Sequence, residues 1–124
     1  MTRRGRIWWA LWCLYAIAWT TALLATFPLA AKDTIVPSEY CFETGKVLHV
    51  SAYAVFALLT SRLPLSVAGL RLMLLFVVLH GPLTEFLQQF TGRTASLMDV
   101  GFDLLGVGLG VVCSWPRWKG PPAA

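Results

Sequence analysis

Charged residues are scarce in this sequence. Only 13% of its 124 residues are charged, whereas 57% are hydrophobic. A soluble domain normally carries about 25% charged residues, and a chain this short would need far more polar surface to remain in solution. The composition therefore excludes a soluble globular domain and predicts an integral membrane protein.

Paired cysteines and a concentrated basic face are also missing. The three cysteines are Cys13, Cys41 and Cys113, with no Cys-x-x-Cys pair. This count and spacing support neither a disulfide framework nor a zinc site, and we expect Cys13 and Cys113 to be buried as small hydrophobic residues. The net charge is +4, but the basic residues are spread over the ends of apolar runs, which excludes a nucleic-acid footprint.

Four apolar segments account for most of the chain, and each is close to the roughly 20 residues that a spanning helix needs. The predicted spans are residues 7–31, 46–63, 70–90 and 97–115. Pro64 and Pro116 end the second and fourth spans, and Gly81-Pro82 interrupts the third. We therefore predict a single all-α domain over residues 1–124. It would be an integral membrane bundle of four transmembrane helices, with a short disordered tail over 116–124.

The lysines and arginines predict the orientation of this bundle. Seven fall on one side of a four-span arrangement: Arg3, Arg4, Arg6, Arg62, Arg71, Arg117 and Lys119. Three fall on the other side: Lys32, Lys46 and Arg93. Because positive residues favour the cytoplasmic side, we expect both termini in the cytoplasm and a multi-pass location in a bacterial inner (plasma) membrane.

The N-terminal segment also resembles a signal peptide, with basic residues at 3–6, an apolar stretch and Leu29-Ala30-Ala31. The apolar part of a signal peptide normally runs about 7–15 residues. Here it runs over residues 7–31, which favours a retained first span. Cleavage would leave three spans in the same orientation.

Polar residues gather at one depth, near the outer ends of three predicted spans. At about 1.5 Å per residue, Glu85 lies about 7 Å below the end of its span. Each helix carries its polar residues on one stripe. The stripes are Lys46, His49 and Tyr53; Glu85, Gln88 and Gln89; and Asp99, Asp103, Gly106 and Gly110. A charge facing lipid at mid-membrane costs about 2.5–3.5 kcal/mol, so we expect the stripes to face one another.

These residues suggest distinct roles. His49, Glu85 and Asp99 are the candidate catalytic groups, with His49 as general acid or base. The candidate ligand-binding residues are Lys46, Tyr53, Gln88, Arg93 and Asp103. Arg93 is expected to form a bidentate pair with a carboxylate or to bind a phosphate. A buried ion network that fixes helix register is the structural alternative.

Other residues are expected to be structural. Pro82 frees a carbonyl in mid-helix, and His80 is predicted to hydrogen-bond unsatisfied backbone there. Gly106-x-x-x-Gly110 allows a neighbouring helix to approach closely. No compact motif supports a metal site, so we predict no metal or cofactor, with a divalent ion held by His49, Glu85, Asp99 and Asp103 as the alternative.

The combined motifs resemble those of the VanZ-like membrane proteins. Lys46-x-x-His49 with Tyr53 matches an earlier motif of that family. A later motif comprises Glu85-x-x-Gln88, Gly92-Arg93, Ser96, Asp99-Val100, Asp103, Gly106 and Gly110. The similarity covers roughly residues 40 to 112. Gly45 stands where the family usually has aspartate, and Asp103 where asparagine is more common.

The resemblance implies a cell-envelope membrane protein and, at family level, a link to glycopeptide resistance; it implies no reaction. Together with the polar stripes, it leads us to expect an outward-facing pocket. This pocket would bind or process an anionic envelope lipid or a lipid-linked cell-wall precursor. One alternative is a non-enzymatic subunit whose polar cluster is structural or docks a membrane protein partner. Another is a small transporter that works as a homo-oligomer.

Overall fold

The computed structural model describes residues 1–25, 35 and 37–119, and within these residues every regular element is helical. The elements are α1 (Arg3–Leu24), the 3₁₀ helix η1 (Ser38–Tyr40), α3 (Cys41–Ser61), α4 (Val67–Gln88), α5 (Leu97–Cys113) and α6 (Pro116–Lys119). The all-α prediction is therefore confirmed for the described chain. The final part of the first predicted span, residues 26–31, and Lys32 lie outside the described residues.

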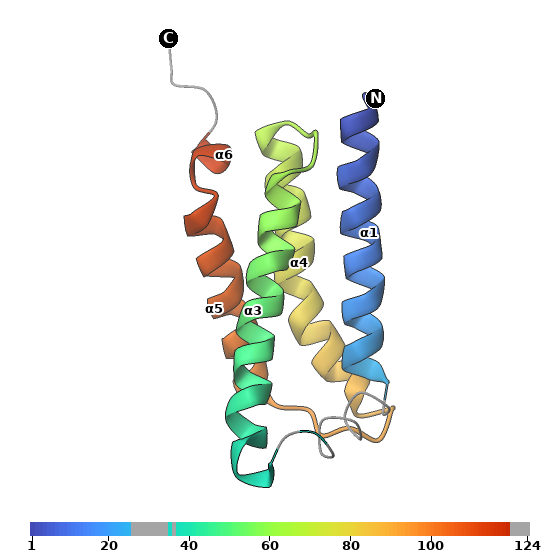
Figure 1. Ribbon diagram of the computed structural model, residues 1–124, viewed down its shortest axis with the longest axis vertical. Helices are drawn as coiled ribbons and strands as arrows, with labels where there is room; N and C mark the ends of the chain where they lie inside the picture. Colours follow the sequence, from blue (N-terminus) through green and yellow to red (C-terminus); the bar gives the residue numbers. More distant parts are fainter. Residues whose placement is uncertain (26–34, 36, 120–124) are drawn as a thin grey trace.

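The four long helices run side by side along the length of the molecule (Figure 1). The start of α1, the connection over residues 62–66 and α6 lie together; we call this the terminal end. The helix η1, the start of α3 and the connection over residues 89–96 lie at the opposite end, the loop end. Successive helices therefore alternate in direction.

Side-chain capping bonds stabilise the first turns of α1 and α4. Thr2 Oγ1 accepts a hydrogen bond from Gly5 N at 3.1 Å, and Ser66 Oγ accepts one from Gly69 N at 3.3 Å. Both hydroxyls satisfy backbone donors that a first helical turn leaves free. Between α4 and α5 the chain turns at Gly92, whose φ of +74° is accessible to glycine at little cost.

The closest helix packing is between α3 and α5, which have the most extensive contact in the bundle. A Cβ atom added at Gly106 would overlap the carbonyl oxygen of Val50. One added at Gly110 would lie 2.5 Å from the carbonyl oxygen of Ala54 and 2.7 Å from Cβ of Ala57. The two glycines therefore permit the backbone approach that the sequence predicted, and they do so within one chain.

The outer surface of the bundle is apolar. One residue from each long helix illustrates this: Leu14, Val47, Leu79 and Val112 are between 57% and 69% exposed. The helices α1 and α4 are long and apolar enough to cross a membrane, yet only 11% and 28% of their apolar windows are buried. Core helices of soluble proteins are mostly buried. An apolar exterior around buried polar groups suits a lipid environment.

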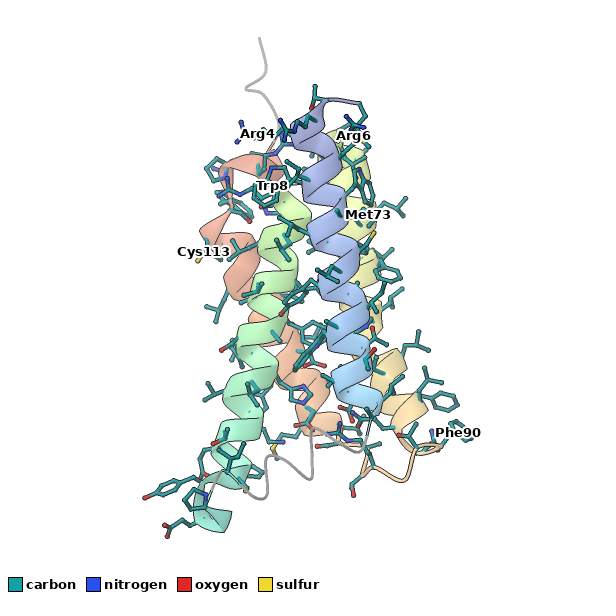
Figure 2. The ribbon with its side chains drawn as sticks, turned by 45° about the vertical axis from the view of Figure 1, so that its right-hand side comes forward. Arg4, Arg6, Trp8, Met73, Phe90 and Cys113 are labelled. Carbon is teal, nitrogen blue, oxygen red and sulfur yellow. The ribbon has the colours of Figure 1, made fainter. Side chains whose placement is uncertain are left out.

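The structure contradicts two predictions, one about the burial of the cysteines and one about the C-terminal tail. Cys13 and Cys113 are exposed on the outside of the bundle, and Figure 2 shows Cys113 pointing away from it. In an apolar environment a small hydrophobic residue gains little by being buried. Residues 116–119 form α6 instead of the start of a disordered tail, and the rest of the predicted tail, residues 120–124, lies outside the described residues. Pro116 suits a first helical position, and Trp118 is 5% exposed and donates to Ser114 Oγ at 2.8 Å.

Candidate functional site

Polar side chains from three helices meet inside the bundle near its loop end. We call Lys46, His49, Glu85, Asp99 and Asp103 the polar cluster. They come from the first half of α3, the last turn of α4 and the first turns of α5. His49, Glu85 and Asp103 are at most 9% exposed, so the predicted stripes face one another at these residues. Gln89 is the exception, because it is exposed and donates to the carbonyl oxygen of Phe86 in the last turn of α4.

Lys46 and Asp99 form the ion pair that joins α3 to α5. Lys46 Nζ donates to Asp99 Oδ1, and the two side chains are 15% and 17% exposed. The ammonium also lies over the rings of Phe42 and Phe102, at 4.7 and 5.6 Å from their centres. Aromatic faces attract cations. Lys46 is therefore held in one place, with part of its surface still accessible.

His49 is oriented by a carboxylate beneath it. Its Nδ1 lies 2.6 Å from Asp103 Oδ1, and Asp103 is only 2% exposed. When the imidazole is neutral with its proton on Nδ1, that nitrogen donates to Asp103 and Nε2 keeps its lone pair. Nε2 lies 3.9 Å from Asp99 Oδ2. This arrangement presents a basic nitrogen toward the other acids of the cluster.

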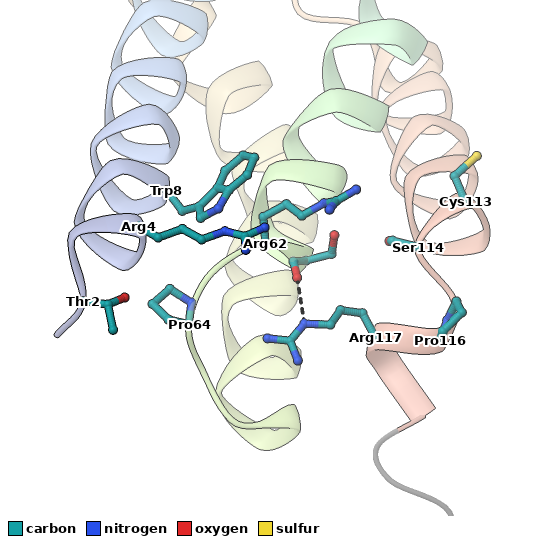
Figure 3. Close-up of a pocket in the computed structure, with 10 residues that line it drawn as sticks. Thr2, Arg4, Trp8, Arg62, Pro64, Cys113, Ser114, Pro116 and Arg117 are labelled. Atoms are coloured by element: carbon teal, nitrogen blue, oxygen red, sulfur yellow. Dashed lines mark hydrogen bonds between the residues drawn. The ribbon is translucent and has the colours of Figure 1, made fainter.

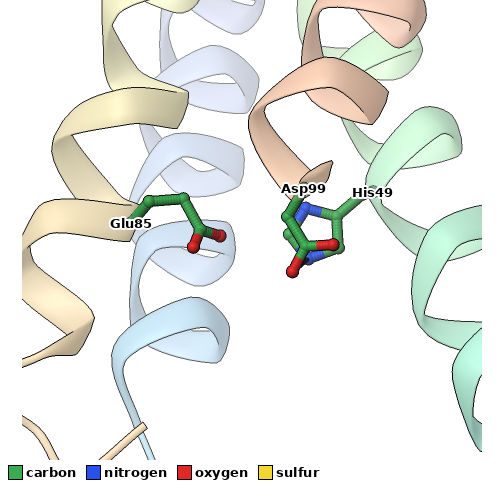
Figure 4. Close-up of side chains that lie close together, drawn as sticks. All are labelled: His49, Glu85 and Asp99. Carbon is green, nitrogen blue, oxygen red and sulfur yellow. Dashed lines mark ion pairs between the residues drawn. The ribbon is translucent and has the colours of Figure 1, made fainter. Parts of the chain in front are cut away.

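Glu85 approaches from the opposite helix. Figure 4 shows its carboxylate directed from α4 toward His49 and Asp99. Glu85 Oε2 accepts a hydrogen bond from Ser96 N at 2.6 Å, which ties α4 to the start of α5. The contact fixes one carboxylate oxygen at the residue that precedes α5.

A divalent metal ion would find suitable ligands here. One ligand atom each from His49, Glu85 and Asp99 lies within 4.8 Å of the others. The bond from His49 to Asp103 resembles the carboxylate that commonly orients a metal-binding histidine. No compact motif revealed this grouping because each ligand comes from a different helix. The absence of a metal site remains a prediction. The alternative, a divalent ion held by these side chains, gains support from the geometry.

A cavity of about 270 Å³ opens beside the cluster. Its lining residues are Cys41, Phe42, Gly45, Lys46, His49, Arg93, Thr94 and Asp99. Two cations, a histidine and a carboxylate thus share one pocket at the loop end. Lys46, His49, Arg93 and Asp99, all predicted site residues, line it together.

Arg93 has different partners from those predicted. Its Nη1 donates to the carbonyl oxygens of Ala22, Leu23 and Ala25 at 2.9, 2.7 and 3.4 Å, and no carboxylate pair with it occurs among the described side chains. The last carbonyls of a helix lack partners within that helix, so the C-terminus of α1 attracts the guanidinium. The turn at Gly92 brings Arg93 back toward α1.

Tyr53 and Gln88 lie beneath the cavity instead of lining it. Tyr53 is fully buried, and Gln88 is 3% exposed. Gln88 Nε2 donates to the carbonyl oxygen of Leu23 at 3.1 Å. The Tyr53 hydroxyl lies 2.8 Å from Nδ1 of His80. Tyr53 and Gln88, which were predicted to bind ligand, therefore join helices in this structure.

His80 links three helices by side-chain bonds. Its Nε2 lies 2.8 Å from Thr20 Oγ1 on α1, and its Nδ1 bonds Tyr53 on α3. The prediction that His80 bonds unsatisfied backbone near Pro82 was therefore wrong, because two hydroxyls occupy both ring nitrogens. The Thr84 hydroxyl lies 2.9 Å from the carbonyl oxygens of both His80 and Gly81 and shares its proton between them. The helix α4 continues through Pro82 to Gln88.

Trp19 is a site residue that the sequence analysis missed. Its ring packs edge-on against His49 and Tyr53, with centres 5.9 and 6.3 Å apart. Trp19 Nε1 and Asp103 Oδ2 are buried polar atoms without a hydrogen-bond partner. The signal was present in the sequence: Trp12, Tyr15 and Trp19 follow i, i+3, i+7 spacing, which places polar-tipped aromatic residues on one face of α1.

Comparisons with family models, curated proteins and solved structures found no match. The VanZ-like resemblance therefore rests on the motif residues alone. We argue function from the geometry of the cavity and the polar cluster.

Proposed function

We propose that this chain is a four-span protein of a bacterial inner membrane with both termini in the cytoplasm. Its basic residues support this orientation. Within the described chain, seven lie toward the terminal end, and only Lys46 and Arg93 lie toward the loop end. The excess favours a cytoplasmic location for the terminal end, and the polar cluster would then face the outer leaflet.

The contacts of α1 support a retained first span. Trp12 Nε1 donates to Thr60 Oγ1 at 2.9 Å, and the Tyr15 hydroxyl donates to the carbonyl oxygen of Ala52 at 2.8 Å. Removing α1 would leave the donors of Arg93 and Gln88 without their partners on that helix. Unpaired buried polar groups cost about 1–3 kcal/mol each. These contacts favour a first span that is retained in the bundle.

We further propose that the loop-end cavity binds or processes the phosphate-bearing head of an anionic envelope lipid or lipid-linked cell-wall precursor. The observation that carries this proposal is that Lys46 and Arg93 line one cavity with His49. Lys46 has three N–H donors and gives one to Asp99; the bonds from Arg93 to α1 all use Nη1. Further donors on both cations are available for phosphate oxygens.

Processing would depend on His49. With Asp103 fixing Nδ1, Nε2 is the nitrogen that can take a proton from, or return one to, a bound group. The VanZ-like resemblance adds an expected effect on glycopeptide susceptibility. It does not define a reaction, and we propose none.

A second candidate is that a divalent cation mediates lipid binding. The polar cluster and Arg93 contain three acids, Glu85, Asp99 and Asp103, but only two permanent cations, Lys46 and Arg93. An added positive charge held by His49, Glu85 and Asp99 would offset the excess and attract a phosphate.

The remaining alternatives have less support. A non-enzymatic subunit would use the cluster only to join helices or to dock a partner. A dimeric transporter was suggested by Gly106 and Gly110, but those glycines already pack against α3. Lipid binding is therefore tested first.

We expect native mass spectrometry of the purified protein to show a tightly held anionic lipid whose retention depends on Arg93. Arg93→Gln removes the charge while its amide can still donate to α1, and it should weaken retention about 10- to 100-fold, the value of a charge-assisted bond of about 1.5–3 kcal/mol. Lys119→Gln removes an equal charge outside the cavity and should have little effect. Identical bulk lipids in all three proteins would contradict the proposal.

Asp99→Asn separates the two modes of binding. If Lys46 and Arg93 hold the phosphate directly, removing a nearby negative charge should maintain or increase lipid retention. If a cation is the bridge, loss of a ligand should decrease retention, and so should a metal chelator added to the wild type.

A further inference from the structure

A second and larger cavity lies at the terminal end, away from the polar cluster. Its volume is about 540 Å³. It is enclosed by the start of α1, the end of α3, and the segment from the end of α5 into α6 (Figure 3). Arg4, Arg62 and Arg117 line it from three separate segments, beside Trp8, Ser61 and Ser114.

No acid of the described residues lies beside the positive charge of this cavity. No carboxylate occurs among its lining residues. In the described part of the chain, the acids lie in η1, in the first turn of α3 or in the polar cluster: Glu39, Glu43, Glu85, Asp99 and Asp103. Three guanidinium groups around one hollow therefore create a field that attracts anions.

Two of the three arginines are held in position. Arg117 Nε donates to the carbonyl oxygen of Ser61 at 3.1 Å, and its Nη2 donates to that of Leu63 at 3.2 Å. The guanidinium of Arg62 lies 6.0 Å from the ring centre of Trp8. Arginines that serve only to orient a membrane protein need no common cavity. Their convergence here favours recognition of a ligand, for which guanidinium groups match phosphate geometry.

An apolar groove lies between α1 and α3, two of the helices that line the cavity. A hollow of about 300 Å³ is lined by Leu11, Leu14, Tyr15, Ala18 and Leu59. Trp8, Leu11 and Tyr15 have i, i+3, i+7 spacing, so the arginine cavity and the groove share one face of α1. Leu11 lies only about 4.5 Å further along the helix than Trp8. A headgroup in the cavity would leave its acyl chain beside the groove.

We propose that the arginine cavity binds the phosphate of an anionic phospholipid, with one acyl chain along the groove between α1 and α3. The three arginines and the absence of a lining carboxylate select the anionic headgroup, and the adjoining groove selects a lipid over free phosphate. In the orientation proposed above, this lipid belongs to the cytoplasmic leaflet. Basic pockets between helices on that side bind anionic headgroups in other membrane proteins.

The test is a titration of the full chain with phosphatidylglycerol or phosphatidylcholine, followed by native mass spectrometry. The double variant Arg4→Gln/Arg62→Gln should lose about five- to tenfold in phosphatidylglycerol affinity for each arginine. Arg3→Gln/Arg6→Gln is the matched control, because it removes the same charge from residues that do not line the cavity; we expect less than about a twofold change. Arg117 is left intact, since its bonds support the ends of α3 and α6.

Three results would overturn the proposal. They are equal losses in the two double variants, equal affinity for phosphatidylcholine, and displacement of the lipid by inorganic phosphate at matching concentration. The last would identify a free-phosphate site. The same losses should appear in an Arg93→Gln background, in which the loop-end site is already weakened, so this lipid site and the loop-end cavity can fail separately. Equal thermal unfolding of both double variants and the wild type establishes that binding, not folding, is measured.

Discussion

Gly106→Leu should prevent α5 from docking on α3 and should destabilise the protein more than any single change in the polar cluster. A Cβ at this position already overlaps the carbonyl oxygen of Val50. That oxygen is part of the α3 backbone, so it cannot rotate away as a side chain would. We expect a loss at or above about 3 kcal/mol, the upper end for overpacked sites. This is a large part of the roughly 5–15 kcal/mol that stabilises a typical domain.

The same helix offers matched controls. Added Cβ atoms at Gly101 and Gly108 would meet nothing within 4 Å. Gly101→Ala and Gly108→Ala should therefore be neutral, or stabilising by up to about 1 kcal/mol through helix propensity. Thermal unfolding in detergent, followed by circular dichroism, measures all three variants. A Gly106→Leu protein as stable as the wild type would show that α5 does not pack as described.

Lys46→Met should destabilise the loop end, whereas Lys46→Met/Asp99→Leu should recover much of that loss. Removing one partner of a buried ion pair costs about 3–5 kcal/mol, but replacing both partners by apolar groups is often neutral. Because the two side chains remain 15% and 17% exposed, we expect a smaller penalty for the single variant, about 1–3 kcal/mol.

This double variant also separates structure from function. If the Lys46–Asp99 pair only fixes helix register, restoring stability should restore every property of the protein. If the cavity binds a lipid phosphate, the restored protein should still fail to retain the lipid in native mass spectrometry. A stable double variant that holds its lipid as the wild type does would contradict a binding role for Lys46.

Much of the fold follows from sequence patterns. Apolar runs bounded by polar residues and prolines indicated four helices, since each run has about the length of a membrane-spanning helix. The common depth of His49, Glu85 and Asp103 indicated that these groups meet. The cysteines show where such patterns fail: in a chain this apolar, Cys13 and Cys113 could equally face lipid or protein.

The partners of individual polar groups were harder to predict. Arg93 binds carbonyl oxygens at the end of α1, and backbone acceptors leave no trace in the sequence. His80 was expected to bond nearby backbone because Pro82, two residues further along, removes a backbone donor. Its actual partners, Thr20 and Tyr53, come from other helices. Tertiary packing against α1 and α3 determined both outcomes.

The central claim is that the polar cavity opens toward the outer leaflet, and cysteine labelling tests it most directly. Gly45 lines the cavity, and an added Cβ there meets nothing within 4 Å. Gly45→Cys would be made in a protein whose three native cysteines are replaced by serine, with Pro64→Cys at the terminal end as the control. In spheroplasts treated with a membrane-impermeant maleimide, we expect Gly45→Cys to be labelled and Pro64→Cys to be labelled only after permeabilisation. The reverse pattern would contradict the account.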